Sequence, residues 1–350
     1  MRRIVFITQQ VDPGDPILAA TVPKIRALAA RLDEVVVLTD RAVPGALPGN
    51  CRIRYFGSRT RVGRGLRFES ALARELARRP RPAMVLAHMC SIYAVLAAPL
   101  ARPLHVPIVL WFNHWRRFRV AEWAERVSTW VVTVDPRTFP IDSAKVRPIG
   151  HGIDLGEFPC AESPAPAPTL RAVALGRYSR AKGLPTVLES VRVARAGGVD
   201  VTLAVHGPSP TAESQAHRAE LEHLVAELEL QDRVQIGGPI ERSRVPDLLA
   251  GSDLLVNNMR EGALDKVVYE AAASCRPVLA SNEGFDALLD GLGVRLRFDS
   301  ESATDLAVRL TAFATLPQDE RARIGRSLRE RVVEGHSVES WAEKLLALVA

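Results

Sequence analysis

The chain has 350 residues, of which 47% are hydrophobic and 25% are charged, and it carries a net charge of +6 at pH 7. This length exceeds what one compact core usually holds, so we expect two domains. The composition excludes a disordered chain, and no apolar run reaches the roughly 18 residues that a membrane-spanning helix needs. The excess of cations is compatible with nucleic acid, anionic lipid or phosphorylated substrates and does not choose among them.

The first half of the chain alternates between segments typical of strands and segments typical of helices. A helix is predicted near residues 19–30. The predicted strands are Ile4–Thr8, Val35–Leu38, Ala83–Ala87, Pro107–Phe112 and Trp130–Val134. Alternation of this kind indicates a parallel sheet with crossover helices. Four prolines then interrupt the pattern, and residues 158–169 are predicted to be a linker.

A second alternating series follows the linker. Its predicted strands are Arg171–Leu175, Val201–Val205, Val234–Ile236, Leu254–Val256 and Val278–Ala280. We therefore predict an α/β protein with two Rossmann-like, doubly wound domains that face each other across a cleft. The domains are expected at residues 1–157 and 170–334. A carboxyl-terminal helix within residues 335–350 is expected to pack back on the first domain.

The four cysteines, at positions 51, 90, 160 and 275, are far apart in the sequence. They form no CxxC pair or Cys–His cluster, so a zinc site is not expected. The amino-terminal apolar stretch is short, lacks a small-residue cleavage site and is typical of a strand rather than of a signal peptide. We therefore expect a cytoplasmic protein whose cysteines are reduced, packed thiols.

The loop after the predicted strand Arg171–Leu175 is rich in glycine and cations. It spans Gly176–Gly183, with the sequence GRYSRAKG, and a helix is predicted directly after it. Ligands of open α/β sheets bind at the carboxyl ends of the strands. Two fixed cations there suit a diphosphate, which needs several hydrogen-bond donors. A basic strand–turn–helix is also common without a ligand, so this loop alone leaves both interpretations open.

A second candidate site follows the predicted strand Leu254–Val256. A helix is predicted to begin at Asp265 or a neighbour and to contain Glu270. Five helical residues rise about 7.5 Å, so a phosphate at the amino end of the helix and a sugar hydroxyl near Glu270 fit one nucleotide. The backbone amides of Leu264–Lys266 and the helix dipole are expected to hold the anion. A carboxylate beside the apolar stretch Ala271–Ala273 is costly unless it is paired, which favours ligand binding over an ordinary solvated residue.

These motifs resemble those of the GT-B glycosyltransferases of the retaining, family-4-like group, the glycosyl transferases group 1. Residues 176–183 match the GRxxxxKG signature of that family, and residues 270–281 resemble its EAMAxGxPV segment. Further likenesses lie, in the expected order, at residues 146–154, 206–208 and 234–256. The resemblance spans nearly the whole chain and is specific in the second half.

The resemblance implies a role for each matching residue. Arg177 and Lys182 are expected to grip the donor diphosphate, and Glu270 is expected to bind the ribose. His114, which follows a predicted strand, is expected to face the donor sugar unless it is a loop histidine without a partner. Gly14, in the loop after the first strand, is expected to admit a phosphate or sugar close to the backbone, although a simple turn explains it equally well.

The donor site is expected to include seven more residues, namely Gly176, Gly207, Glu261, Gly262, Leu264, Asp265 and Lys266. One departure from the family pattern concerns its acidic positions. The family often has two glutamates with seven residues between them, whereas Glu261 and Glu270 have eight. Alignment on Glu270 places Gly262 at the first position, in what looks like a GSLDKV-type variant, and leaves the role of Glu261 open.

We therefore expect a retaining glycosyltransferase of hexosyltransferase type, which moves a sugar from a nucleoside diphosphate sugar to an acceptor. The resemblance implies front-face attack, with the departing phosphate accepting the proton of the acceptor. Two alternatives stay open. One is a sugar-nucleotide epimerase of GT-B fold, and the other is a non-catalytic GT-B-like partner that binds nucleotide or acts as a scaffold.

No metal or cofactor is expected, because no DxD element stands out and Arg177 and Lys182 supply the positive charge. The acceptor stays open among a saccharide, a lipid and a small-molecule aglycone. Residues Trp115–Arg119 mix aromatic side chains with arginines, which is compatible with peripheral membrane contact through lipid headgroups or with an anionic acceptor. Nucleic-acid binding is not expected, because one such patch is weak support for it.

Overall fold

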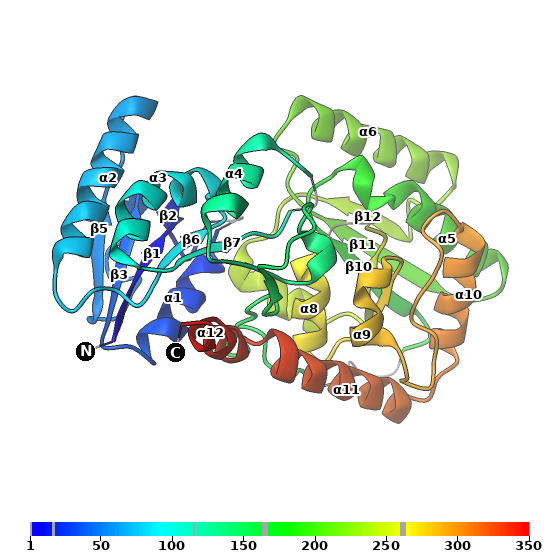
Figure 1. Ribbon diagram of the computed structural model, residues 1–350. Helices are drawn as coiled ribbons and strands as arrows, with labels where there is room; N and C mark the ends of the chain where they lie inside the picture. The colour runs from blue at the N-terminus through cyan, green and yellow to red at the C-terminus, as the bar shows by residue number, and fades with distance from the viewer. Residues whose placement is uncertain (1, 16–17, 115, 163–166, 260–263, 350) are drawn as a thin grey trace. The chain divides into compact units, whose positions relative to one another are not determined.

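The structure is a computed structural model that describes residues 2–15, 18–114, 116–162, 167–259 and 264–349. It divides into two compact units (Figure 1). Unit 1 comprises Met1–Asp154 and Gly335–Ala350, and unit 2 comprises Leu155–Glu334. Each unit is built around its own parallel sheet, as the alternation of strand and helix patterns predicts.

Among the described residues, the sheet of unit 1 has seven parallel strands in the order β5-β3-β1-β6-β7-β8-β9. Their bounds are β1 Arg3–Ile7, β3 Glu34–Thr39, β5 Cys51–Tyr55, β6 Val85–His88, β7 Ile108–Trp111, β8 Trp130–Thr133 and β9 Val146–Pro148. Val5 of β1 is paired with Val36 of β3 and with Val85 of β6, and every residue of β1 is buried. Apart from Arg3, β1 is an apolar run, as is typical of a strand covered on both faces.

Helices cover the sheet of unit 1. The helices are α1 Thr21–Ala29, α2 Arg61–Ala77, α3 Ser91–Ala101, α4 Arg119–Val127 and α12 Val338–Ala347. The short elements are β2 Gln10–Val11, β4 Arg41–Ala42, η1 Arg102–Leu104 and η2 Pro136–Thr138. Helix α3 packs between α2 and α4 over the core, where the rings of Phe56, Phe68 and Tyr93 lie 4.7–5.6 Å apart (Figure 1).

The carboxyl-terminal helix α12 packs against α1 within unit 1. Trp341 of α12 meets Trp111 of β7 edge to face, with ring centroids 5.6 Å apart. The ammonium group of Lys24, on α1, lies 4.5 Å from the centre of the Trp111 ring and 5.4 Å from that of Trp341. Aromatic burial and cation–π contact therefore join α12 to α1 and β7.

Among the described residues, the sheet of unit 2 has five parallel strands in the order β12-β11-β10-β13-β14. Their bounds are β10 Leu170–Leu175, β11 Val201–His206, β12 Val234–Gly237, β13 Leu254–Asn257 and β14 Val278–Ala280. The helices are α5 Leu184–Ala196, α6 Ala212–Glu227, α7 Val245–Ala250, α8 Lys266–Ala273, α9 Asp286–Leu289, α10 Ala303–Ala314 and α11 Gln318–His336. Short 3₁₀ turns lie at η3 Arg180–Lys182, η4 Arg242–Arg244 and η5 Glu283–Phe285.

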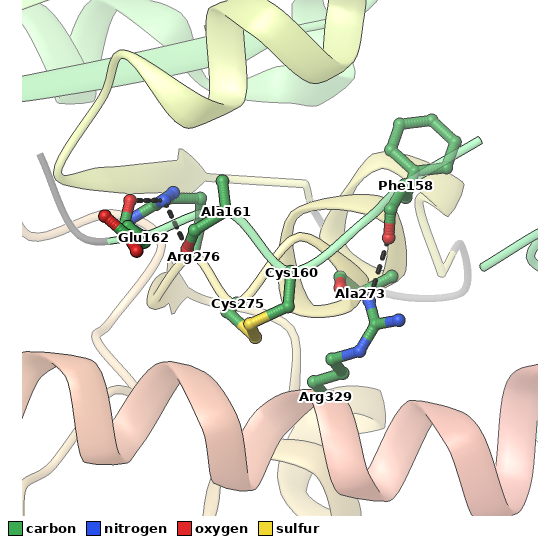
Figure 2. The surroundings of a disulfide bond; sticks show 8 residues. All are labelled: Phe158, Cys160, Ala161, Glu162, Ala273, Cys275, Arg276 and Arg329. Atoms are coloured by element: carbon green, nitrogen blue, oxygen red, sulfur yellow. Dashed lines mark hydrogen bonds between the residues drawn. A yellow bond between two sulfur atoms is a disulfide. The ribbon is translucent and has the colours of Figure 1, made fainter. Parts of the chain in front are cut away.

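A disulfide between Cys160 and Cys275 fastens the first described segment of unit 2 to the end of α8 (Figure 2). The expectation that all four cysteines are reduced thiols is therefore wrong for this pair. Their separation of 115 residues concealed a Cα–Cα distance of 4.9 Å, which only the tertiary fold creates. The disulfide also removes the cysteine-based argument for a reducing compartment. Cys51 and Cys90 are free, and burial raises the pKa of the Cys90 thiol to about 12.

Two arginines hold the same segment by its backbone (Figure 2). Arg276, which is fully buried, donates from Nη2 to the carbonyl oxygens of Ala161, at 2.8 Å, and of Glu162. Arg329 of α11 donates from Nη1 to the carbonyl oxygens of Phe158, at 2.8 Å, and of Ala273. We call the segment Glu157–Glu162 the strap. Hydrogen bonds and the disulfide together hold it against the carboxyl end of α8.

Candidate functional site

Two loops meet at the middle of the unit 2 sheet. The chain runs from β10 outward to β11 and β12, and it then returns to β13 on the other side of β10. Ala172 and Val173 of β10 are therefore paired with Leu254 and Leu255 of β13. Open α/β sheets bind ligands at the carboxyl edge beside such a reversal of strand order. Here the reversal brings residues 176–183 beside the amino end of α8.

Lys182 lies at this junction. Its Nζ donates to the carbonyl oxygen of Leu175 at 3.2 Å, at the end of β10, and forms an ion pair with Asp265, at the start of α8. Gly176 makes room for it, because a Cβ there would lie 2.4 Å from Nζ. The φ of Gly176 is +129°, which other residues rarely adopt. Gly207 packs beneath, because a Cβ there would lie 1.9 Å from the carbonyl oxygen of Gly176.

The two arginines of the loop differ in their surroundings. Arg177 is exposed and forms no ion pair with any described residue. Arg180 is paired with Glu220 of α6 at 2.6 Å, and its side chain is 61% exposed. The exposed ion pair of Arg180 therefore contributes little to stability. The guanidinium donors of Arg177 remain available to a ligand.

Asp265 is the N-cap residue of α8, which confirms the predicted helix start. Its carboxylate does not cap the helix, because it accepts from Lys182 and, at 2.8 Å, from Nδ2 of Asn257. An N-cap aspartate ordinarily accepts from an amide of the first turn. The amino end of α8 therefore keeps its positive dipole for an anion. Leu264, which precedes Asp265, is buried and packs closely against Gly284.

Glu270 is a buried carboxylate on α8, with 3% of the residue exposed. Its Oε1 accepts from Nη1 of Arg242 at 2.5 Å and pairs with Nζ of Lys266 at 3.0 Å. Burial opposes ionisation, but the charges of Lys266 and Arg242 outweigh it and lower the pKa of Glu270 below its ordinary value. Glu270 is consequently an anion at neutral pH. The apolar surroundings indeed required partners, and both are cations.

Arg242 is a site residue that the sequence motifs did not reveal. It begins η4, just after β12, and its Nε and Nη2 donate to the two carboxylate oxygens of Glu157 at 2.6 and 3.0 Å. Its guanidinium also lies over the ring of Phe158, at 4.7 Å from the centroid. A cation just after a strand at the carboxyl edge was the signal that could have found it.

The remaining predicted residues lie elsewhere. Glu261 and Gly262 are outside the described residues. His114, in unit 1, is exposed after β7; its N–H donates to the carbonyl oxygen of Thr138 at 3.1 Å, and its Nδ1 accepts from the amide of Arg116 at 3.0 Å. Gly14, also in unit 1, is exposed, and its amide donates to Oδ1 of Asp12 at 2.8 Å in a local turn.

The described residues of unit 2 thus bring together Gly176, Lys182, Gly207, Leu264 and Asp265, while Lys266 and Glu270 lie on the following helix. In the part of the chain that the structure describes, no three His, Cys, Asp or Glu side chains gather as metal ligands would. None of the described helices combines the length and apolar character that a membrane crossing requires. The site therefore combines the cation Lys182, the amino end of α8 and, further along the same helix, the ionised carboxylate of Glu270.

Comparison with known proteins decides the family of this unit. Residues 161–331 match the family described as "Glycosyl transferases group 1". These residues of the chain belong to that family. A relative from Escherichia coli K12, the putative colanic acid biosynthesis glycosyltransferase WcaL, is 26% identical over 205 residues, which is 57% of this chain. The chain spans about half the length of this curated relative, of which 49% is aligned.

Several solved structures are similar to this chain over nearly its full length. A glycosyltransferase of Rickettsia africae superposes with a TM-score of 0.77 at 14% identity, over 99% of this chain and 97% of its own. Anabaena HepE, in complex with UDP and glucose, gives 0.76 at 16% identity, over 100% and 99%. Sucrose-phosphate synthase of Thermosynechococcus elongatus gives 0.72 at 20% identity, over 99% and 98%. At these identities the likeness shows the fold, and the predicted α/β fold class of GT-B type is confirmed.

Proposed function

We propose that this protein is a retaining glycosyltransferase that moves a hexose from a nucleoside diphosphate sugar to an acceptor. One observation carries the proposal. Lys182 meets the amino end of α8 at the reversal of strand order, and the ionised Glu270 follows five residues after Asp265 on the same helix. That spacing, about 7.5 Å along a helix, fits the diphosphate and the ribose of one nucleotide. The group 1 family match and the fold likeness to HepE with UDP support it.

The cations act on the leaving group. The nucleoside diphosphate leaves as the bond between the sugar carbon and its terminal phosphate oxygen breaks, so negative charge develops on that oxygen. Lys182 and Arg177 stabilise that charge from fixed positions, together with the amino end of α8. Before the donor binds, Asp265 neutralises Lys182. The diphosphate then takes the place of that partner and accepts from the ammonium group. The departing phosphate accepts the proton of the acceptor hydroxyl, and the new bond forms on the face that the diphosphate leaves.

Glu270 holds the nucleoside. A carboxylate accepts hydrogen bonds from the hydroxyls of a ribose diol, and Glu270 is ionised for this purpose by Lys266 and Arg242. His114 and Gly14 of unit 1 are proposed to face the donor sugar. His114 is exposed after a strand of a parallel sheet, in the position where such sheets present ligand-binding loops.

Peripheral membrane contact at the amino end of α4 is part of the proposal. Phe118 is 40% exposed and Trp123 is 47% exposed. Arg117 and Arg119 are exposed beside them, and Trp115 lies outside the described residues. Aromatic side chains flanked by cations suit the headgroup region of an anionic lipid layer. Sedimentation with anionic liposomes at low salt should carry the protein down, and Arg119→Glu should weaken this. Failure of the wild-type protein to sediment would end the idea.

Transfer itself is tested with labelled donors. The purified protein is incubated with UDP-, GDP- and ADP-linked sugars, each with and without saccharide and lipid acceptors. We expect label to move to an acceptor and nucleoside diphosphate to be released, with the anomeric configuration retained by NMR. Lys182→Ala should abolish most transfer, whereas Arg180→Ala, in the same loop, should not. An isomerised donor formed without acceptor would indicate the epimerase instead. Nucleotide binding without any turnover would indicate a non-catalytic partner.

A further inference from the structure

The described residues of the protein contact one oxygen of Glu270. Among the described residues, Oε1 interacts with both Arg242 and Lys266, whereas Oε2 receives no hydrogen bond. A carboxylate held by one oxygen has its plane and its free lone pairs fixed by the groups that hold it. The direction of Oε2 is therefore set by the two cations.

Arg242 is in turn held from its opposite edge. Nε and Nη2 face the carboxylate of Glu157 in a bidentate contact, while Nη1 faces Glu270. The ring of Phe158 supports the flat face of the guanidinium. Both supporting residues belong to the strap, which Cys160 and the arginines behind it fasten to α8. A planar guanidinium gripped on one edge and one face has little freedom to rotate.

Charged groups of both signs meet in this cluster. Among the described residues, the printed ion pairs join two carboxylates, Glu157 and Glu270, to two cations, Arg242 and Lys266. The side chain of Arg242 is mostly buried, with 18% of it exposed, and that of Glu270 is more deeply buried, with 4% exposed. Removal of Arg242 would take one of its two cations from the buried Glu270, in a region of low polarity where a weakly paired charge is costly. Arg242 therefore helps to fix the position of the Glu270 carboxylate.

We propose that Arg242 is a positioning residue for the nucleoside: it holds Glu270 through Oε1 so that Oε2 faces the 2′- and 3′-hydroxyls of the ribose. This rests on the proposed function, in which Glu270 binds the ribose. Arg242 touches neither the diphosphate nor the reacting carbon, so its contribution belongs to recognition of ribose rather than to charge stabilisation in the transition state. Lys266 holds the same oxygen from its own helix, but it is a flexible point charge and does not fix a plane.

The inference has a specific consequence. A hydrogen bond to a charged group distinguishes a nucleotide that has the hydroxyl from one that lacks it by about 10- to 100-fold in affinity. The wild-type protein should therefore prefer a nucleoside diphosphate over its 2′-deoxy analogue by a factor in this range. Without Arg242 the carboxylate turns toward Lys266, and most of this preference should disappear. Binding of inorganic pyrophosphate, which has no ribose, should not change.

Calorimetric titration tests this with UDP, GDP and ADP, their 2′-deoxy analogues and inorganic pyrophosphate. The variants are Arg242→Met, Arg242→Lys and the control Arg309→Met. Arg309 forms an ion pair with Asp305 on α10 and, like Arg242, has 18% of its side chain exposed. We expect the ratio of ribo to deoxyribo affinity to collapse in Arg242→Met, to fall in Arg242→Lys and to stay at the wild-type value in Arg309→Met.

The outcomes separate this inference from the function on which it rests. If Arg242→Met keeps the wild-type ratio, or loses affinity for pyrophosphate and for both nucleotides equally, the positioning role is refuted and the arginine is merely structural. If Arg242→Met fails to fold, Arg242→Lys decides, because it keeps the charge but cannot grip both carboxylates. If the wild-type protein binds none of the nucleotides, the proposed function fails and the inference fails with it.

Discussion

Reduction of the Cys160–Cys275 disulfide should destabilise unit 2 strongly while leaving its nucleotide site in place. The bond closes a loop with a sequence separation of 115 residues. For a loop of that length the chain-entropy model gives about 4.8 kcal/mol of stabilisation at 25 °C, and measured values commonly lie at about 2–4 kcal/mol. A loss of this size corresponds to a fall of roughly 4–20 °C in Tm for a unit as large as Leu155–Glu334.

Affinity for nucleotide should change much less than stability. The strap remains held to α8 in the reduced protein, because Arg276 and Arg329 bind its carbonyl oxygens without help from the sulfur atoms. Glu270 also lies in the middle of α8, whereas Cys275 of the disulfide is the second residue after the carboxyl end of that helix. Reduction mainly raises the conformational entropy of the unfolded chain, so it changes the folded site little.

The assay compares the oxidised protein, the reduced protein and Cys160→Ser by thermal unfolding, with and without the nucleotide that binds best. Cys51→Ser is the matched control, since Cys51 is free. Titration of thiols in denaturant should find two in the oxidised protein and four after reduction. Four thiols in the untreated protein, or equal Tm values for the oxidised and reduced forms, would refute the reasoning.

Three further predictions concern the donor site. Lys182→Ala should lower kcat by about 10²- to 10³-fold, as the loss of one preorganised donor does elsewhere, with Arg180→Ala near wild type in the same steady-state assay. Gly176→Ala should impair nucleotide binding in calorimetry and cost about 1–3 kcal/mol in denaturant unfolding, because its Cβ would strike Lys182, whereas Gly49→Ala, with open space around it, should do neither. The ion pairs of Glu270 should stabilise the fold fully above pH about 4.5 and lose effect as the pH falls through its lower folded pKa. Glu270→Gln should therefore flatten the acid-side fall of Tm.

The buried strands were predictable, and so were the edge strands of unit 2, but the two edge strands of unit 1 were not. Apart from Arg3 and Arg171, β1 and β10 are apolar runs, because both faces of a parallel sheet are covered. β5, at Cys51–Tyr55, carries two exposed arginines and lies at the margin of its sheet, and the three-residue β9 lies at the other margin. Their pairing comes from the neighbouring strand rather than from their own sequence pattern.

The candidate site was predictable where chemistry and local sequence coincide. Glu270 stood out because its neighbours are apolar, and Lys266, one helical turn earlier, could have been named as its partner from the i,i+4 spacing. Arg242 and Glu157 reach the site from 28 and 113 residues away along the chain, so only the tertiary fold reveals them. The Cys160–Cys275 disulfide could not be predicted from the sequence for the same reason.

The most direct test of the account is a crystal structure of the protein with the nucleoside diphosphate that raises Tm most. We expect the diphosphate to lie against Lys182 and the amino end of α8, with the Lys182–Asp265 ion pair opened and a ribose hydroxyl on Oε2 of Glu270. A nucleotide bound elsewhere on unit 2, or one whose ribose does not reach Glu270, would contradict the central claim that these residues form the donor site.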